Sequence, residues 1–224
     1  MTLENTFLLI KKRKIKVNDD IISNGSIHVK ENEDIVKYND EVINYRPFVY
    51  IMMNKPDGVI SATEDKEHKT VIDLLGNNYR TYSLFPVGRL DKDTEGLMLL
   101  TNDGELAHKL ISPKKDVEKK YYVEVSGELK NEHLEIVKEG VTLEDGYKCK
   151  PARLEILDTS EGNSKANIFI TEGKFHQVKR MMKSLGTTVT YLKRLSIGSL
   201  KLDENLKLGE YRYLTDDELN KLTK

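Results

Sequence analysis

Short apolar runs and amphipathic segments alternate along most of the chain. Apolar runs bounded by turn residues predict strands over residues 48–53, 84–87, 97–101, 119–126, 147–157, 165–171 and 188–195. Helical spacing ended by Gly or Pro predicts helices over residues 70–75, 105–111, 130–138 and 175–185, and residues 215–218 form a capping box that starts a terminal helix. Strands joined both by tight turns and by helices favour an α+β fold with a mostly antiparallel sheet.

The first part of the chain has a different pattern and predicts a separate small module. Short strands are expected over residues 14–17, 27–30 and 41–45, with turns at residues 18–20 and 24–25 and the end of a helix over residues 6–12. The composition changes near Pro47. We therefore expect one domain over residues 1–46 and a second over residues 47–224.

A polar turn between two apolar runs is the most informative local pattern. The segment PVGRLDKDTEGLMLLTND, residues 86–103, places Asp91 at the edge of a predicted sheet, two residues after Arg89. A nearby cation favours the ionised carboxylate, which suits a nucleophile or a charge stabiliser. Aspartate in such a turn is also a common turn or cap residue. Three neighbours fit the same polar pattern, so spacing alone does not single out Asp91: Asp93, Thr94 and Glu95.

Charge is segregated although the formal net charge is only -1. Residues 11–16 hold five cations and no acid, residues 109–121 hold five lysines against two acids, and residues 173–200 hold six cations and no acid. Any one run fits a solvated surface, but three together favour a basic face for phosphates. Cys149 is the only cysteine, which excludes an internal disulfide and favours a reducing cytoplasm. No apolar stretch approaches membrane-spanning length.

The segment TEGKFHQVKRMMKSLG supplies a second set of candidates. Its helical spacing predicts four core residues, Phe175, Val178, Met182 and Leu185. Lys179 lies near the predicted sheet end, where it meets a carboxylate such as Asp91 or remains an ordinary surface lysine. Lys174 and Arg180 lie off the apolar face. His176 fits a structural hydrogen-bonding role better than acid–base chemistry.

Tyr121 and its neighbour Tyr122 lie on opposite faces of a predicted strand. One is expected in the core and the other at a surface or cleft. A ring beside a carboxylate and several cations suits stacking on an extruded nucleobase, although tyrosine is also a common strand residue. The five histidines offer no metal-ligand spacing, and no phosphate-binding loop or dinucleotide fingerprint is present. We therefore expect no metal and no cofactor.

Together these segments resemble the pseudouridine synthases, and among them the RsuA type that acts on the small ribosomal subunit. The matching pieces are MMNKPDGVISATED, PVGRLDKDTEGLMLLTNDGELAHKLISPKK, EKKYYVEV, TEGKFHQVKRMM and GEYRYLTDDEL. The resemblance implies that Asp91 is catalytic, that Tyr121 stacks on the target base and that Lys179 is the basic partner of Asp91. It also implies that Arg89 helps to hold the opened RNA strand.

Residues 1–46 resemble an S4 RNA-binding module, through IKKRKIKVNDDIISNGSIHVKENEDIV. The sequence before Ile10 is about one helix shorter than this pattern, so the module is either reduced or lacks its start here. RNA contacts are expected from Lys11, Lys12 and Arg13, and in the larger domain from Arg89, Lys174 and Arg180.

The resemblance implies isomerisation of one uridine in 16S rRNA, uridine 516 in the usual rRNA numbering, in a partly assembled small subunit. The expected enzyme is cytoplasmic and monomeric. Alternatives are a 23S rRNA pseudouridine synthase, a non-catalytic RNA-binding assembly protein and a nucleoside glycosylase. A glycosylase requires a second carboxylate to position water, and none stands out.

Overall fold

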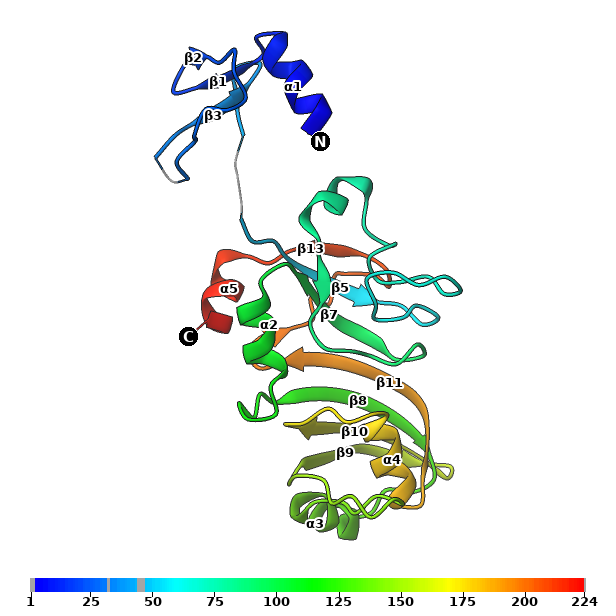
Figure 1. The fold of residues 1–224 in the computed structure, drawn as a ribbon. Coiled ribbons are helices and arrows are strands. Elements are labelled where there is room, and N and C mark those ends of the chain that lie inside the picture. The colour runs from blue at the N-terminus through cyan, green and yellow to red at the C-terminus, as the bar shows by residue number, and fades with distance from the viewer. Residues whose placement is uncertain (1–2, 32, 44–46, 224) are drawn as a thin grey trace. The chain divides into compact units, whose positions relative to one another are not determined.

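The computed structural model describes residues 3–31, 33–43 and 47–223. The chain divides into two compact units, Met1–Pro47 and Phe48–Lys224, each of which is described by itself. None of the helices in the described ranges has the length and apolar character needed to cross a membrane. The expected α+β architecture with a mostly antiparallel sheet is confirmed (Figure 1).

In the described part of the smaller unit, a helix accompanies a four-stranded antiparallel sheet in the order β2-β1-β3-β4. Its elements are α1 (Leu3–Lys11), β1 (Ile15–Val17), β2 (Asp20–Ile21), β3 (Val36–Tyr38) and β4 (Glu41–Val42). Asn18 and Asp19 both have positive φ, at 51° and 72°, and make the tight turn between β1 and β2.

The strand expected over residues 27–30 is wrong, because β3 takes the place beside β1. The side chain of Asp34 accepts hydrogen bonds from Lys30 N, at 2.8 Å, and from Asn18 Nδ2, at 2.7 Å. These bonds bring Lys30 and Asn18 to the Asp34 side chain, so Lys30 does not continue a strand along the sheet. The expected strand over residues 41–45 is seen as β4, and residues 44–45 lie outside the described residues.

The larger unit is built on one sheet with the path β13-β5-β7-β11-β8-β10-β9, while β6 pairs with β7 and β12 with β11. Its strands are β5 (Tyr50–Lys55), β6 (Phe85–Pro86), β7 (Glu95–Thr101), β8 (Lys119–Ser126), β9 (Arg153–Ser160), β10 (Asn163–Ile170), β11 (Thr188–Ile197), β12 (Leu200–Lys201) and β13 (Tyr211–Tyr213). Its helices are η1 (Asn77–Tyr82), α2 (Gly104–Ile111), α3 (Asn131–Glu139), α4 (Gln177–Ser184) and α5 (Asp216–Thr223).

Strand β11 joins the two halves of this sheet. It pairs antiparallel with β8 on one side and parallel with β7 on the other, where Arg194 lies opposite Gly96. Gly96 has φ +101°, and a Cβ there would lie 2.3 Å from the Arg194 carbonyl oxygen. Only glycine therefore permits the close approach of the two strands at this point.

Apolar residues alternate along the strands and form a core on each face of the sheet. In β5, Ile51 and Met53 join the core that α3 and α4 cover, while Met52 joins the core that α2 and α5 cover (Figure 1). Asp103 caps α2 by accepting from Leu106 N, and the predicted capping box is present, since Thr215 and Glu218 bind reciprocally at the start of α5.

Three expected elements of the larger unit differ from the structure. Residues 70–75 form a turn and no helix, because Asp73 Oδ2 binds both the N and the Oγ1 of Thr70 and Thr70 pairs with Ile60. The strand expected from residue 147 begins at Arg153, since residues 141–149 close a loop of their own. Helix α4 begins at Gln177, so Phe175 is not a core residue and is 76% exposed.

Candidate active site

Asp91 lies in the loop between β6 and β7, just before β7 begins. The backbone of Thr94 donates to the Asp91 carbonyl oxygen at 3.1 Å and closes the predicted turn. The residue before Asp91 is fixed by Ser61, whose Oγ accepts from Leu90 N and donates to Leu90 O, both at 2.9 Å. The catalytic candidate is therefore held by its backbone at the edge of the sheet.

Lys55, the last residue of β5, anchors the same turn through hydrogen bonds to its backbone. It is fully buried and donates from Nζ to the carbonyl oxygens of Pro56 at 3.0 Å, Lys92 at 3.1 Å and Thr94 at 2.8 Å. Burial lowers the pKa of Lys55 to about 8. A buried lysine is costly unless its donors are used, and here all three bind backbone around the Asp91 turn.

Replacing Lys55 by methionine should lower the free energy of unfolding by about 2–4 kcal/mol, because buried carbonyl oxygens lose their donor. Urea denaturation of the variant and of the wild type measures this difference. Lys66→Met is the matched control, since Lys66 is exposed and has no ion pair with a described residue. Equal stability of the two variants would contradict the anchoring role.

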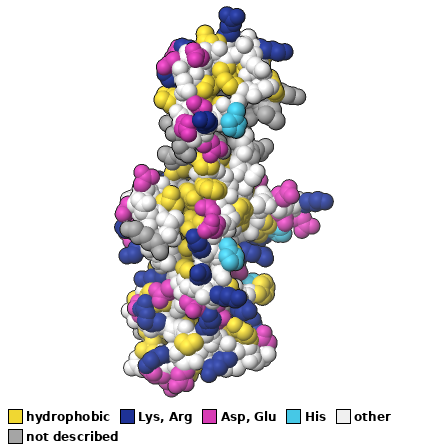
Figure 2. Space-filling model, turned by 60° about the vertical axis from the view of Figure 1, so that its left-hand side comes forward, with side chains coloured by type: hydrophobic (Ala, Val, Ile, Leu, Met, Phe, Trp, Pro, Cys, Tyr) yellow, Lys and Arg dark blue, Asp and Glu magenta, His cyan; other side chains and the backbone are white. Residues whose placement is uncertain are grey.

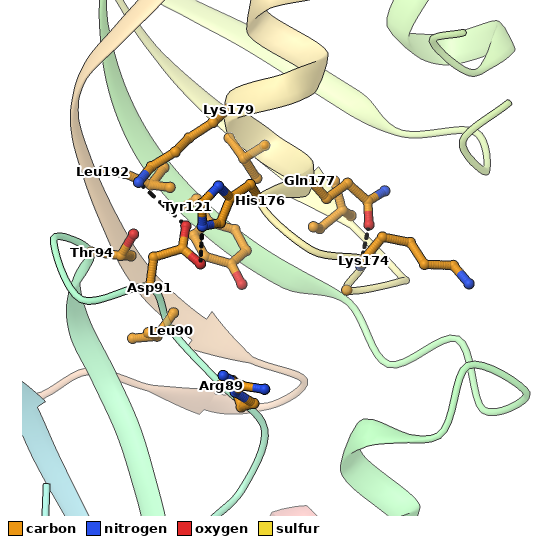
Figure 3. A pocket seen from close by; sticks show the side chains of 13 residues that line it. Arg89, Leu90, Asp91, Thr94, Tyr121, Lys174, His176, Gln177, Lys179 and Leu192 are labelled. Carbon is orange, nitrogen blue, oxygen red and sulfur yellow. Dashed lines mark hydrogen bonds and ion pairs between the residues drawn. The ribbon is translucent and has the colours of Figure 1, made fainter. Parts of the chain in front are cut away.

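Two basic side chains contact the Asp91 carboxylate (Figure 3). Lys179 Nζ lies 3.3 Å from Asp91 Oδ2, and His176 Nε2 lies 3.6 Å from Asp91 Oδ1. Lys179 also donates to Asp93 Oδ1 at 2.5 Å, which holds the pKa of Asp93 below its usual value. The Asp91 side chain is only 26% exposed, so its negative charge is largely removed from solvent. The contacts with Lys179 and His176 compensate that charge.

The loop before α4 positions both basic residues. Gln177 accepts from Lys174 N at 2.8 Å and donates to Glu172 at 2.6 Å, which fixes the loop at the start of the helix. His176 has φ 49°, a left-handed conformation that is uncommon outside glycine. Its ring stacks on Phe175 with the centroids 3.8 Å apart. The site thus receives His176 from the loop and Lys179 from the first turn of α4.

Tyr121 completes the pocket. It lies in β8, is 7% exposed, and lines the same pocket as Asp91, with its ring beside the carboxylate in Figure 3. Tyr122 lies on the opposite face, where its hydroxyl donates to Glu124 at 2.6 Å. Of the two tyrosines, it is therefore Tyr121 that faces the pocket of Asp91.

Comparison with known proteins identifies the family. The sequence profile described as RNA pseudouridylate synthase matches residues 49–184. A Bacillus subtilis protein named as an uncharacterized RNA pseudouridine synthase is 51% identical over 87% of this chain and 82% of its own length. The chain belongs to the RNA pseudouridine synthase family. It is thus an isomerase that acts on RNA.

Other relatives place this pseudouridine synthase within the RsuA type. The ribosomal small subunit pseudouridine synthase A of Haemophilus influenzae is 38% identical over 96% of this chain and 91% of its own length. A crystal structure described as pseudouridylate synthase, 37% identical, superposes with a TM-score of 0.73 and covers 99% of this chain and 94% of that one.

The remaining predicted residues of this pseudouridine synthase fall into three groups. Arg89 and Lys174 line the Asp91 pocket, although Arg89 makes no ion pair with any described residue and lies apart from Asp91 in Figure 3. The cation beside Asp91 is therefore Lys179, not Arg89. Arg180 turns away and pairs with Asp145 at 2.5 Å. In the smaller unit, exposed basic residues end α1 and follow it: Lys11, Lys12 and Arg13.

The structure distinguishes Asp91 from the other polar residues of its turn, which have different contacts. Asp93 is exposed and binds Lys179, whereas Glu95 accepts from the Tyr191 hydroxyl at 2.6 Å. Thr94 is 1% exposed, lines the pocket, and its Oγ1 has no hydrogen-bond partner among the described residues. In those residues, no group of three or more His, Cys, Asp and Glu side chains is placed to hold a metal ion.

Proposed function

We propose that this enzyme isomerises one uridine of 16S rRNA to pseudouridine in the cytoplasm during ribosome assembly, with uridine 516 as the expected target. Support comes from relatives named as ribosomal small subunit pseudouridine synthase A, which are 33–38% identical to this chain and match 94–96% of it. The observation that carries the catalytic assignment is the Asp91 carboxylate, bound by Lys179 and His176 beside the Tyr121 ring.

The reaction requires a carboxylate next to a glycosidic bond. The C1′–N1 bond of uridine breaks, the uracil turns over, and C5 bonds to C1′ while the C5 proton is lost and N1 gains one. Asp91 serves this sequence by attacking C1′ or the uracil ring, or by assisting a glycal intermediate. The Lys179 ammonium stabilises the carboxylate in each case. The atoms balance without a redox change.

Tyr121 and the basic residues are assigned to binding. The uridine has to leave its stack to reach Asp91, and the Tyr121 ring in the same pocket suits the face of the extruded uracil. Lys and Arg side chains are densest over the middle and lower part of the larger body, at the height of α2, α4 and β8–β11 (Figure 2). Phosphates of structured RNA would be held there by Arg89, Lys174 and Arg180.

The smaller unit is proposed to be an S4-like RNA-binding module. Its exposed basic residues Lys11, Lys12 and Arg13 have no ion pair with a described residue, which leaves them available to phosphates. Each unit would contact RNA on its own surface, and the larger unit alone would contain the chemistry.

Pseudouridine mapping on rRNA tests the proposed function directly. Carbodiimide labelling and primer extension are applied to rRNA from cells with and without the gene, and to 16S transcripts and reconstituted small-subunit particles treated with purified enzyme. Loss of one 16S site, restored by the enzyme in vitro, is the expected result. A lost 23S site would overturn the 16S assignment. The absence of modification in every sample would favour a non-catalytic RNA-binding protein.

A further inference from the structure

A second cavity adjoins the catalytic pocket. Its volume is about 310 Å³, and it shares Arg89, Tyr121, Gly173 and Lys174 with the pocket that holds Asp91. We name it the basic pocket, because five cationic residues line it: Arg89, Lys119, Lys150, Lys174 and Arg194.

Two of these cations are buried and have no carboxylate partner among the described residues. Lys119 is 8% exposed and donates from Nζ to the Val117 carbonyl oxygen at 2.8 Å. Arg194 is 2% exposed and donates from Nε to the Leu97 carbonyl oxygen at 2.8 Å. Burial and the charge of Arg194 together lower the pKa of Lys119. Buried cations without counter-ions are costly and favour the binding of an anion.

The one acidic residue that lines the basic pocket is already occupied. The carboxylate of Glu172 accepts from the Tyr147 hydroxyl at 2.8 Å, from Lys150 N at 2.9 Å and from Gln177 Nε2 at 2.6 Å. Lys150 has its own partner outside the lining, Asp116, at 2.6 Å. The charge that remains open to a ligand therefore belongs to Arg89, Lys119, Lys174 and Arg194.

We propose that the basic pocket binds the phosphodiester group next to the target uridine, with Lys119 and Arg194 as its buried phosphate ligands. This inference rests on the proposed function, because the ligand is the same RNA strand whose uridine enters the Asp91 pocket. The shared wall formed by Arg89 and Tyr121 places the two pockets side by side. A strand that puts its base beside Tyr121 therefore has an adjoining phosphate at the mouth of the basic pocket. A phosphodiester is a monoanion with several acceptor oxygens, which suits a pocket that offers both lysine and arginine donors.

The test combines a protein variant with a modified RNA. The RNA is a synthetic fragment around whichever uridine the mapping identifies, with a neutral methylphosphonate at the linkage on either the 5′ or the 3′ side. The proteins are the wild type, Lys119→Gln and the matched control Lys120→Gln. Lys120 is the next residue of β8 and lies on the opposite face of the strand. The dissociation constant is measured for each pair.

One of the two methylphosphonate linkages should weaken binding to the wild type by roughly tenfold, and Lys119→Gln should weaken binding of the native RNA by a similar factor. When Lys119→Gln binds the RNA with that same methylphosphonate linkage, the affinity should fall no further than with either change alone. Lys120→Gln should keep the full methylphosphonate effect. If both methylphosphonate linkages weaken binding to Lys119→Gln as much as they weaken binding to the wild type, the effects are additive and the proposal is overturned. A second outcome would also overturn it: neither methylphosphonate weakens RNA binding, yet inorganic phosphate competes with the RNA in the wild type and not in Lys119→Gln. That outcome would indicate a site for free anions.

Two further features keep the test decisive. Thermal unfolding checks that Lys119→Gln is folded, and Lys174→Gln replaces it if it is not, because Lys174 is exposed and lines the same pocket. The methylphosphonate effect on the wild type needs no variant at all. If no uridine is modified, the proposed function fails. If the RNA is modified and neither linkage is coupled to Lys119, only the phosphate assignment fails.

Discussion

Replacing Asp91 by asparagine should abolish isomerisation and leave RNA affinity within a few-fold of the wild type. The amide has the shape of the carboxylate but neither its charge nor its nucleophilic oxygen, so the step at C1′ or the uracil ring is lost. Lys179 stays in place through its 2.5 Å bond to Asp93, so the pocket keeps its form. Single-turnover pseudouridine formation and RNA binding are measured on the same preparation.

Asp93→Asn is the matched control for this variant. Asp93 belongs to the same turn and binds the same lysine, but it is exposed and does not line the catalytic pocket. Its replacement should retain activity within about tenfold, since it leaves the Asp91 carboxylate intact. Turnover by Asp91→Asn that equals turnover by Asp93→Asn would refute the assignment of Asp91 as the catalytic residue.

Replacing Lys179 by methionine is expected to lower the rate of the chemical step by about 10²-fold. Methionine keeps much of the apolar stem but removes the ammonium that lies 3.3 Å from Asp91 Oδ2. A charged group that is positioned against the reacting atoms typically contributes a rate factor of this size. Because Lys179 acts through Asp91, the loss should appear in kcat more than in KM, and Lys179→Arg should restore part of it.

Lys183→Met provides the comparison one helical turn further along α4. Lys183 pairs with Glu144 at 2.8 Å on an exposed surface and does not line the Asp91 pocket. This variant should keep the wild-type rate. A normal rate in Lys179→Met as well would leave His176 as the only basic side chain that Asp91 requires, and the role given to Lys179 would be wrong.

The sequence pattern predicted the part of the site that depends on local turns and periodicity. The turn after residues 84–87 placed Asp91 at a sheet edge, and the helical spacing of residues 175–185 brought Lys179 toward it. Alternation in β8 separated Tyr121 from Tyr122. These features follow from side-chain periods of 2 and 3.6 residues, which need no knowledge of distant pairing.

Features that depend on tertiary context were not predicted. In the sequence, Lys55 follows an apolar run and resembles an ordinary polar residue at the end of a strand. Its anchoring role was not predicted, because only the folded chain brings the carbonyl oxygens of Lys92 and Thr94 to its ammonium. The left-handed φ of His176 has only a weak signature in its residue type, because histidine is enriched in this conformation but seldom adopts it. Residues 27–30 and 70–75 have suitable local patterns, but the side chains of Asp34 and Asp73 bind backbone there and favour turns.

The position of β11 in the middle of the sheet has a consequence for how the enzyme is made. Asp91 precedes β7 in one half of the sheet, Tyr121 lies in β8 of the other half, and Lys179 lies in α4. Strand β11 is synthesised after all three. Its pairing with β7 joins residues about one hundred positions apart in the sequence, and such long-range contacts form late. The side chains assigned to catalysis are therefore synthesised before the strand that joins the two halves of the sheet. The side chains around Asp91 are therefore brought together only once β11 has been inserted between β7 and β8.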